Sequence, residues 1–263
     1  MSAVRPFAGR LVRAERAQQT VRSLSHSQDE SGVDLLGVGY EDSAYGDPAA
    51  AVYVYRQAQG GAAYTGLFVD VAVSAIAAGL VRAHEAVDQL RVDALIWHHA
   101  KRPGPPMPVK LLQQPGPRLR QVLAEAEARE PLLDFPGPLG FQQTIWRVEE
   151  GADELLAELT ESTLYIADGH HRTAAALAEW EQGDRPDEAA LMCVVYPLDA
   201  LVLSAFHRRV PGRVDPDALV ALAGETYSVL EADAIPEPDI GRLGMYAGGR
   251  WFVLTGGPTA RGV

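Results

Sequence analysis

The sequence has few cysteines, few basic residues and no long hydrophobic run. Its one cysteine, Cys193, excludes an internal disulfide, and the apolar residues around it indicate a buried strand position. Lysine and arginine number 23 against 35 aspartate and glutamate, which gives a formal net charge of −12. This acidic balance argues against nucleic acid or an anionic membrane surface as the main partner. No run has the length of a transmembrane helix, and the N-terminus lacks the apolar segment of a signal peptide, so we expect a cytoplasmic protein.

Signatures of several common classes of site are also missing. The chain has no Gly-x-x-x-x-Gly-Lys-Ser/Thr loop and no Gly-x-Gly-x-x-Gly turn, which excludes the two best-known phosphate-binding loops. It has no Cys-x-x-Cys pair, no His-Glu-x-x-His helix and no Gly-x-Ser-x-Gly elbow. These absences argue against the corresponding zinc sites and against a serine nucleophile of the hydrolase type. Any phosphate chemistry would therefore use a different loop.

Length and composition are those of an ordinary globular protein, with 47% hydrophobic and 22% charged residues. The 263 residues are enough for one large domain or two lobes. Two predicted strands, at residues 51–55 and 64–73, are joined through Gly60-Gly61, which indicates a hairpin. Predicted strands and helices alternate along the chain, but many strands pair locally. This pattern predicts an α+β fold with a mixed sheet and not a doubly wound parallel sheet.

Capping residues and helix breakers predict further elements. Ser74 is expected to cap a short helix through Gly79. A longer helix is expected from about His84 to His99, because the proline-rich residues 103–106 exclude its continuation. The remaining predicted elements are helices at 118–129, 152–159, 170–181 and 216–225, strands at 141–148, 164–167, 190–196 and 201–210, and a hairpin at 243–254.

The densest group of polar side chains lies at residues 168–173, which read Asp-Gly-His-His-Arg-Thr. The group stands between a predicted buried strand and an alanine-rich helix. The first N–H groups of a helix favour anions, and basic side chains beside them indicate a phosphate-type ligand. Asp168 adds a metal ligand or a substrate-orienting group. The structural alternative is a helix cap in which Asp168 accepts backbone N–H groups and Arg172 forms a surface ion pair.

The run from Tyr165 to Arg172 resembles the signature of a large bacterial and archaeal family of unknown function. Other matches to this family occur in the same order and extend over nearly the whole chain. They are Arg5-Pro6-Phe7, Tyr53 to Gln57, Thr65-Gly66-Leu67, Gly79 with His84-Glu85, Trp146 to Val148, and His207-Arg208.

The Asp-Gly-His-His-Arg motif is also similar to that of free serine kinases with the ParB/sulfiredoxin fold. The resemblance implies a pyrophosphate-dependent kinase that phosphorylates the hydroxyl of free L-serine and yields O-phospho-L-serine and phosphate. It implies a ParB/sulfiredoxin-like core at residues 73–199, and an additional lobe in which residues 200–263 pack with residues 1–72. The active-site cleft would lie between core and lobe. The expected partners are small molecules, with no nucleic acid and no membrane.

The residues suit this chemistry, which needs positioning and charge neutralisation more than covalent steps. By analogy with the family, Glu85 is the catalytic base for the serine hydroxyl. Asp168 would bind Mg²⁺ or hold the serine ammonium group, and the sequence leaves both roles open. The expected contacts to the phosphate donor are Gly169, His170, His171, Arg172, Thr173, His207 and Arg208.

Three alternatives use the same residues. The donor would be ADP or ATP in relatives with this fold, and no sequence feature distinguishes these donors from pyrophosphate. A ParB-like nucleotide-binding module acting on DNA fits poorly with the acidic charge. A metal-dependent phosphohydrolase built on Asp168, His170 and His171 would need further ligands. For Glu85 alone, the simpler interpretation is a solvated carboxylate at a helix start.

Overall fold

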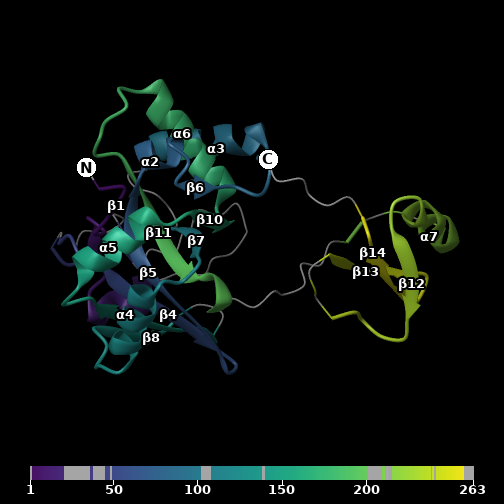
Figure 1. The fold of residues 1–263 in the computed structure, drawn as a ribbon, viewed down its shortest axis with the longest axis horizontal. Helices are drawn as coiled ribbons and strands as arrows, with labels where there is room; N and C mark the ends of the chain where they lie inside the picture. The colour runs from purple at the N-terminus through teal and green to yellow at the C-terminus, as the bar shows by residue number, and fades with distance from the viewer. Residues whose placement is uncertain are drawn as a thin grey trace. The chain divides into compact units, whose positions relative to one another are not determined.

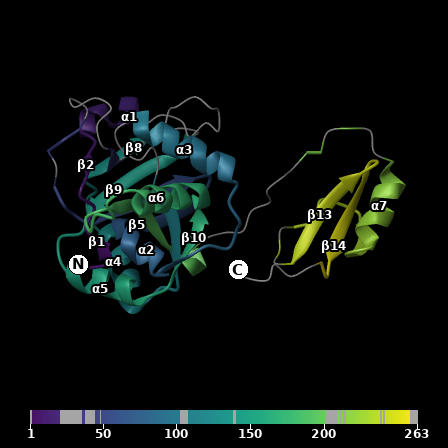
Figure 2. The ribbon, with the colours of Figure 1, turned by 90° about the horizontal axis from the view of Figure 1, so that it is seen from above.

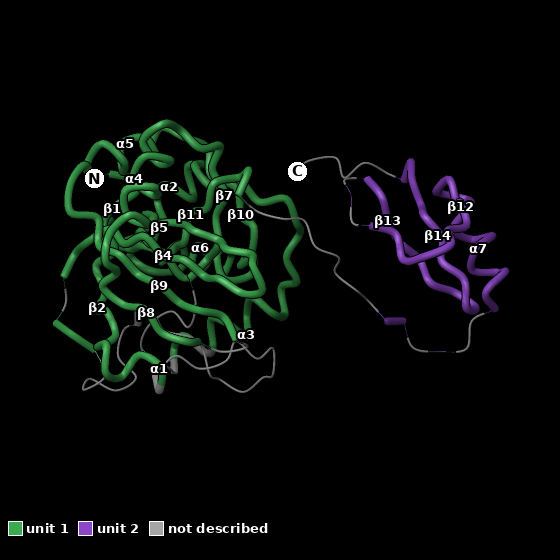
Figure 3. Tube along the Cα trace, turned by 90° about the horizontal axis from the view of Figure 1, so that it is seen from below, with its two compact units in different colours: residues 1–201 green, residues 202–263 purple. Residues whose placement is uncertain are grey.

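In a computed structural model the chain forms two compact units, Met1–Leu201 and Val202–Val263 (Figure 3). No helix in the described part of the chain is long and apolar enough to cross a membrane. The structure describes residues 2–20, 36–37, 45–47, 49–101, 108–137, 140–200, 209–210, 212, 215–237, 239 and 241–257.

Unit 1 contains a nine-stranded mixed sheet (Figures 1 and 2). Its strands are β1 (Val4–Arg5), β4 (Tyr53–Gln59), β5 (Ala62–Ala72), β6 (Val81–Arg82), β7 (Val109–Gln113), β8 (Leu133–Pro136), β9 (Gln142–Arg147), β10 (Leu164–Asp168) and β11 (Ala190–Pro197). The order is β6-β10-β7-β11-β5-β4-β9-β8, and β1 pairs with β5. Only the pairs β6–β10 and β7–β11 among the described strands of this sheet are parallel. The expected mixed α+β fold is confirmed.

The helices that pack on the main core lie on one face of this sheet, whereas Ala17 of α1 belongs to the core of the other face. The helical elements of unit 1 are η1 (Ala14–Arg16), α1 (Ala17–Thr20), α2 (Val73–Ala77), α3 (Gln89–Lys101), α4 (Pro117–Glu127), α5 (Ala152–Glu161), α6 (His170–Gln182) and η4 (Leu198–Ala200). Apolar residues of α2, α4 and α5 share one buried cluster with alternate strand residues such as Leu67, Val69 and Val71. Ala176 of α6 packs against the same cluster.

The intervening strand residues form a second core on the opposite face. Tyr53, Tyr55 and Phe68 pack there with N-terminal residues that include Phe7 and Tyr45. Successive strand side chains point to opposite faces, so β4, β5 and β11 each supply both cores. A small antiparallel ribbon of β2 (Arg10–Leu11) and β3 (Leu36–Gly37) belongs to this N-terminal part.

Unit 2 contains a three-stranded antiparallel sheet in the order β12-β14-β13, together with a helix. Phe252 and Leu254 are buried in its core, where Leu219 and Val220 of the helix pack against them. The elements are α7 (Pro216–Gly224), β12 (Ser228–Ala232), β13 (Arg242–Ala247) and β14 (Arg250–Thr255). The predicted hairpin around Gly248-Gly249 is confirmed.

Several sequence predictions differ from the structure. The helix expected from His84 begins at Gln89 instead, because the carboxylate of Asp88 accepts the backbone N–H of Leu90 and so caps the helix there. Ser74 lies inside α2 and does not cap it; the N-cap is Ala72, which has no side chain to accept a hydrogen bond.

The short strands β7, β8 and β12 were not predicted, since runs of four or five residues carry little periodicity. Most of the strand expected at 201–210 lies outside the described residues. Strands on both sides of the boundary expected between residues 72 and 73 pair within one sheet of unit 1. The expected division of the chain into three segments stays a prediction.

The turn between β10 and α6 depends on Gly169. Its φ of +106° is one that side chains with a Cβ rarely adopt. A Cβ at this position would lie 3.0 Å from Cγ2 of the buried Val109 and 3.1 Å from Nη2 of Arg172. Glycine is therefore required both by the backbone conformation and by the space that is left.

We expect Gly169→Ala to lower the free energy of unfolding by roughly 2–4 kcal/mol, as the sum of a left-handed conformation and local overpacking. Gly79 is a matched control, because its φ is +91° but no atom lies within 4 Å of the place that an added Cβ would take. Gly79→Ala should cost only the conformational part, about 1–2 kcal/mol. Chemical denaturation of both variants measures the difference in free energy of unfolding. Equal losses in the two variants would contradict the overpacking expected at Gly169.

Candidate active site at the start of helix α6

The pairing of β6 with β10 brings two distant segments together. The strands are parallel neighbours, with Leu164 opposite Val81 and Tyr165 opposite Arg82. Parallel strands end at the same edge of a sheet, so the segment after β6 meets the turn after β10. The first segment, residues 83–88, carries the His-Glu pair, and the turn leads into α6 at His170.

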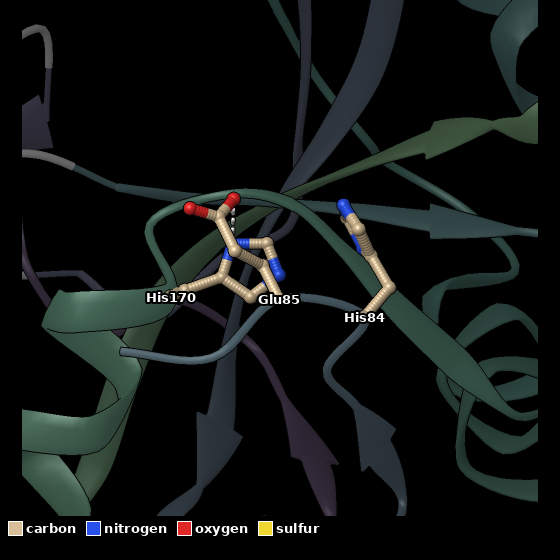
Figure 4. Close-up of side chains that lie close together, drawn as sticks. All are labelled: His84, Glu85 and His170. Carbon is tan, nitrogen blue, oxygen red and sulfur yellow. Dashed lines mark ion pairs between the residues drawn. The ribbon is translucent and has the colours of Figure 1, made fainter. Parts of the chain in front are cut away.

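Three side chains converge at this edge (Figure 4). Nδ1 of His170 lies 4.0 Å from Oε2 of Glu85. The rings of His84 and His170 meet edge to face, with centroids 4.5 Å apart and planes at 87°. The His170 side chain is only 5% exposed, whereas the Glu85 side chain is 61% exposed. The site therefore combines a buried imidazole with a carboxylate that solutes can reach.

The electrostatics of His170 favour a neutral ring. Burial lowers the pKa of His170, and the neighbouring His84 lowers it further. The carboxylates of Glu85 and Asp168 act in the opposite direction and raise this pKa, but the net shift is downward. At neutral pH His170 is thus suited to donate or accept a hydrogen bond, and it does not supply a fixed positive charge.

His171 has a different task from its neighbour. Its Nε2 accepts the backbone N–H of Asp88 at 3.0 Å, which requires the ring proton on Nδ1. The carboxylate of Asp88 in turn caps α3 through Leu90. His171 therefore connects α6 to the end of the segment that carries Glu85, and in this arrangement its Nε2 is not available to a phosphate.

Arg172 is also engaged by the protein. Its Nη2 donates to Oδ2 of Asp168 at 2.7 Å, and its Nη1 donates to the carbonyl oxygen of Pro108 at 2.7 Å. The Arg172 side chain is 11% exposed. The guanidinium thus joins the end of β10 to the residue before β7, and both of its terminal nitrogens already have partners. The sequence predicts a contact from Arg172 to the phosphate donor, whereas in the structure its guanidinium binds other groups of the protein.

No side chain caps the start of α6. Gly169 is the N-cap and makes no side-chain cap. The hydroxyl of Thr173 donates to the carbonyl oxygen of Gly169 and does not face outward as a donor to a ligand. The first N–H groups of a helix have no intrahelical partner, so an anion can bind them.

Asp168 fits the ligand chemistry of Mg²⁺, the ion that the family resemblance implies. Magnesium is held by one or two carboxylates together with phosphate oxygens and water. Oδ2 of Asp168 accepts from Arg172, and the side chain is 56% exposed. Asp168 and Glu85 both lie close enough to His170 to raise its pKa. Two accessible carboxylates therefore adjoin the open helix start.

The structure thus brings together Glu85, Asp168 and residues 169–173. His207 and Arg208, the two further anion contacts expected from the sequence, lie outside the described residues. Sequence reasoning gave no role to His84, although it stands next to Glu85 in the His-Glu pair. The link through Asp88 was also missed, because it depends on where α3 begins.

Comparisons with known proteins identify a family but no activity. No curated protein and no solved structure shows significant similarity to the chain. A family model described as "Protein of unknown function (DUF1015)" matches residues 41–261. Since the match covers most of the sequence and includes the site at the start of α6, the chain belongs to this family of proteins of unknown function.

Proposed function

We propose that this protein is a cytoplasmic pyrophosphate-dependent L-serine kinase with a ParB/sulfiredoxin-like core. The observation that carries the proposal is the position of the exposed Glu85 carboxylate, 4.0 Å from Nδ1 of His170. His170 has a lowered pKa and stands at the start of α6, which no side chain caps. A base and an anion-binding helix start side by side are the two parts that phosphoryl transfer to an alcohol needs. The choice of L-serine and pyrophosphate as substrates rests on the resemblance of the Asp-Gly-His-His-Arg motif to that of free serine kinases.

In the proposed reaction Glu85 orients the serine hydroxyl and accepts its proton. The serine oxygen forms a bond to the terminal phosphorus of pyrophosphate, while the bond from that phosphorus to the bridging oxygen breaks. Phosphate leaves with the bridging oxygen, and the products are O-phospho-L-serine and phosphate. The 61% exposure of Glu85 is consistent with a base that must meet a diffusing substrate.

The donor would bind through the backbone N–H groups at the start of α6, aided by the helix dipole. Mg²⁺ held by Asp168 would neutralise charge on the phosphate oxygens. His171 and Arg172 act as positioning residues in this proposal, because their polar atoms hold the segments that form the site. Nucleoside diphosphates and triphosphates share the terminal phosphoryl group, so donor identity is decided by assay.

The first test supplies the purified full-length protein with L-serine, Mg²⁺ and either pyrophosphate, ADP or ATP. We expect phosphoserine with pyrophosphate, detected by mass spectrometry, in an amount that matches the phosphate released. Phosphoserine formed with ADP or ATP but not with pyrophosphate would show that the donor is a nucleotide. Phosphate release that does not depend on serine would indicate a phosphohydrolase, and no product with any donor would refute the kinase.

The second test replaces the base. Glu85→Gln keeps the shape of the side chain but cannot accept a proton, so we expect kcat to fall by roughly 10²–10⁴-fold. The KM for pyrophosphate should change little, since the donor binds at the helix start. The control is Glu181→Gln, which removes an exposed carboxylate from the C-terminal end of α6, far from the donor site at its start. Near-normal kcat in Glu85→Gln would refute the role of Glu85.

The third test separates the two roles open to Asp168. Asp168→Asn retains an oxygen that accepts from Arg172 but removes the negative charge. If Asp168 holds Mg²⁺, the Mg²⁺ concentration for half-maximal rate should rise by about tenfold or more, with a smaller change in the KM for serine. The reverse pattern would assign Asp168 to the serine ammonium group. Thermal denaturation of the variant checks that the ion pair with Arg172 is not needed for folding.

A further inference from the structure

The side chains of His84, Glu85 and His170 form a compact set of potential metal ligands (Figure 4). One ligand atom from each residue lies within 4.8 Å of the others. His84 and Glu85 come from the exposed segment between β6 and α3, and the buried His170 comes from the start of α6. The ligands therefore come from two elements that the sheet brings together.

The types of ligand select a class of metal. Two imidazole nitrogens and one carboxylate oxygen suit zinc, cobalt and similar divalent transition metals. Magnesium prefers oxygen ligands and retains its waters, so this set is distinct from the Mg²⁺ position considered at Asp168. Three protein ligands leave at least one coordination position for water or a substrate oxygen.

The distances allow closure around an ion. Ligand atoms on a tetrahedral zinc ion lie about 3.4 Å apart, given zinc–nitrogen and zinc–oxygen bonds of about 2.0–2.2 Å. The ligand atoms lie within 4.8 Å of one another in the structure, so the widest separation must shorten by at most roughly 1.4 Å. His84 and Glu85 are exposed and lie outside helices and strands, so a change in their side-chain torsions suffices.

The state of His170 provides a second, independent observation. Its side chain is 5% exposed, and its Nε2 is buried with no hydrogen-bond partner among the described residues. Buried polar atoms almost always have a partner, and an ion bound to Nε2 would supply the partner that this atom lacks. The ring is in contact with His84 and Glu85, the other two members of the cluster.

We propose that His84, Glu85 and His170 form a binding site for one divalent transition-metal ion of the zinc class. The consequence for activity rests on the proposed function. An ion bound to Glu85 occupies the oxygen that would accept the serine proton, so zinc acts as an inhibitor of phosphoryl transfer. Metal binding itself does not depend on that function.

Binding is tested with Co²⁺ and Zn²⁺ on the metal-free full-length protein. Co²⁺ bound by nitrogen and oxygen ligands with low coordination number absorbs visible light far more strongly than the hydrated ion. We expect this spectrum to saturate at one Co²⁺ per chain and to disappear when Zn²⁺ is added. No saturable spectrum and no heat of Zn²⁺ binding by calorimetry would overturn the proposal.

The variants identify the ligands. His84→Ala should weaken the affinity for Co²⁺ by at least about tenfold, a loss that even outer partners of metal ligands can cause. His99→Ala is the matched control, because His99 of α3 also has a carboxylate neighbour. Its Nδ1 lies 2.9 Å from Oε2 of Glu179, which belongs to α6. Affinity for Co²⁺ that is unchanged in His84→Ala, or equally weakened in His99→Ala, would overturn the assignment.

Activity measurements separate this proposal from the proposed kinase. Serine phosphorylation with Mg²⁺ should be inhibited by Zn²⁺ in the unaltered protein and should resist Zn²⁺ in His84→Ala. A saturable Co²⁺ spectrum in a protein without kinase activity would support the metal site and refute the kinase. Kinase activity in a protein that shows no Co²⁺ spectrum would support the kinase and refute the metal site.

Discussion

The site depends on the parallel pairing of β6 with β10. These are short strands, and β6 contributes only Val81 and Arg82, yet their register decides which residues follow at the edge of the sheet. Because both strands end there, Glu85 and His170 meet although 85 positions separate them along the chain. The buried side chains of Val81 and Leu164 hold this pairing within the main core. A shift in register would move the two segments apart.

The polar residues of the turn between β10 and α6 have two different roles, one in holding elements together and one in the candidate site. His171 and Arg172 are basic residues that the sequence associates with an anion, but in the structure they bind Asp88, Asp168 and the carbonyl oxygen of Pro108. They join α6 to the segment after β6 and to the residue before β7. These hydrogen bonds fix the relative positions of the elements that they join more than they add charge to a site. His170 and the helix start remain for chemistry.

Much of this arrangement could be predicted from the sequence. Apolar runs in β4, β5 and β11 indicated strands, and the run before Asp168 indicated a strand followed by a helix. The start of α3 could not be predicted as easily, since capping by Asp88 competes with helical periodicity that extends back toward His84. Strands as short as β6 and β7 carry too few residues to show a period.

The sequence alone determined the composition of the site: a glycine that permits a left-handed turn, two adjacent histidines, and carboxylates at positions 85 and 168. These properties are local, because backbone conformation and residue chemistry act over a few positions. Only the tertiary structure decided which of these groups face one another. It paired His170 with Glu85 and His84, and it assigned His171 and Arg172 to the scaffold. Such contacts depend on strand register and burial, which involve residues far apart in the chain.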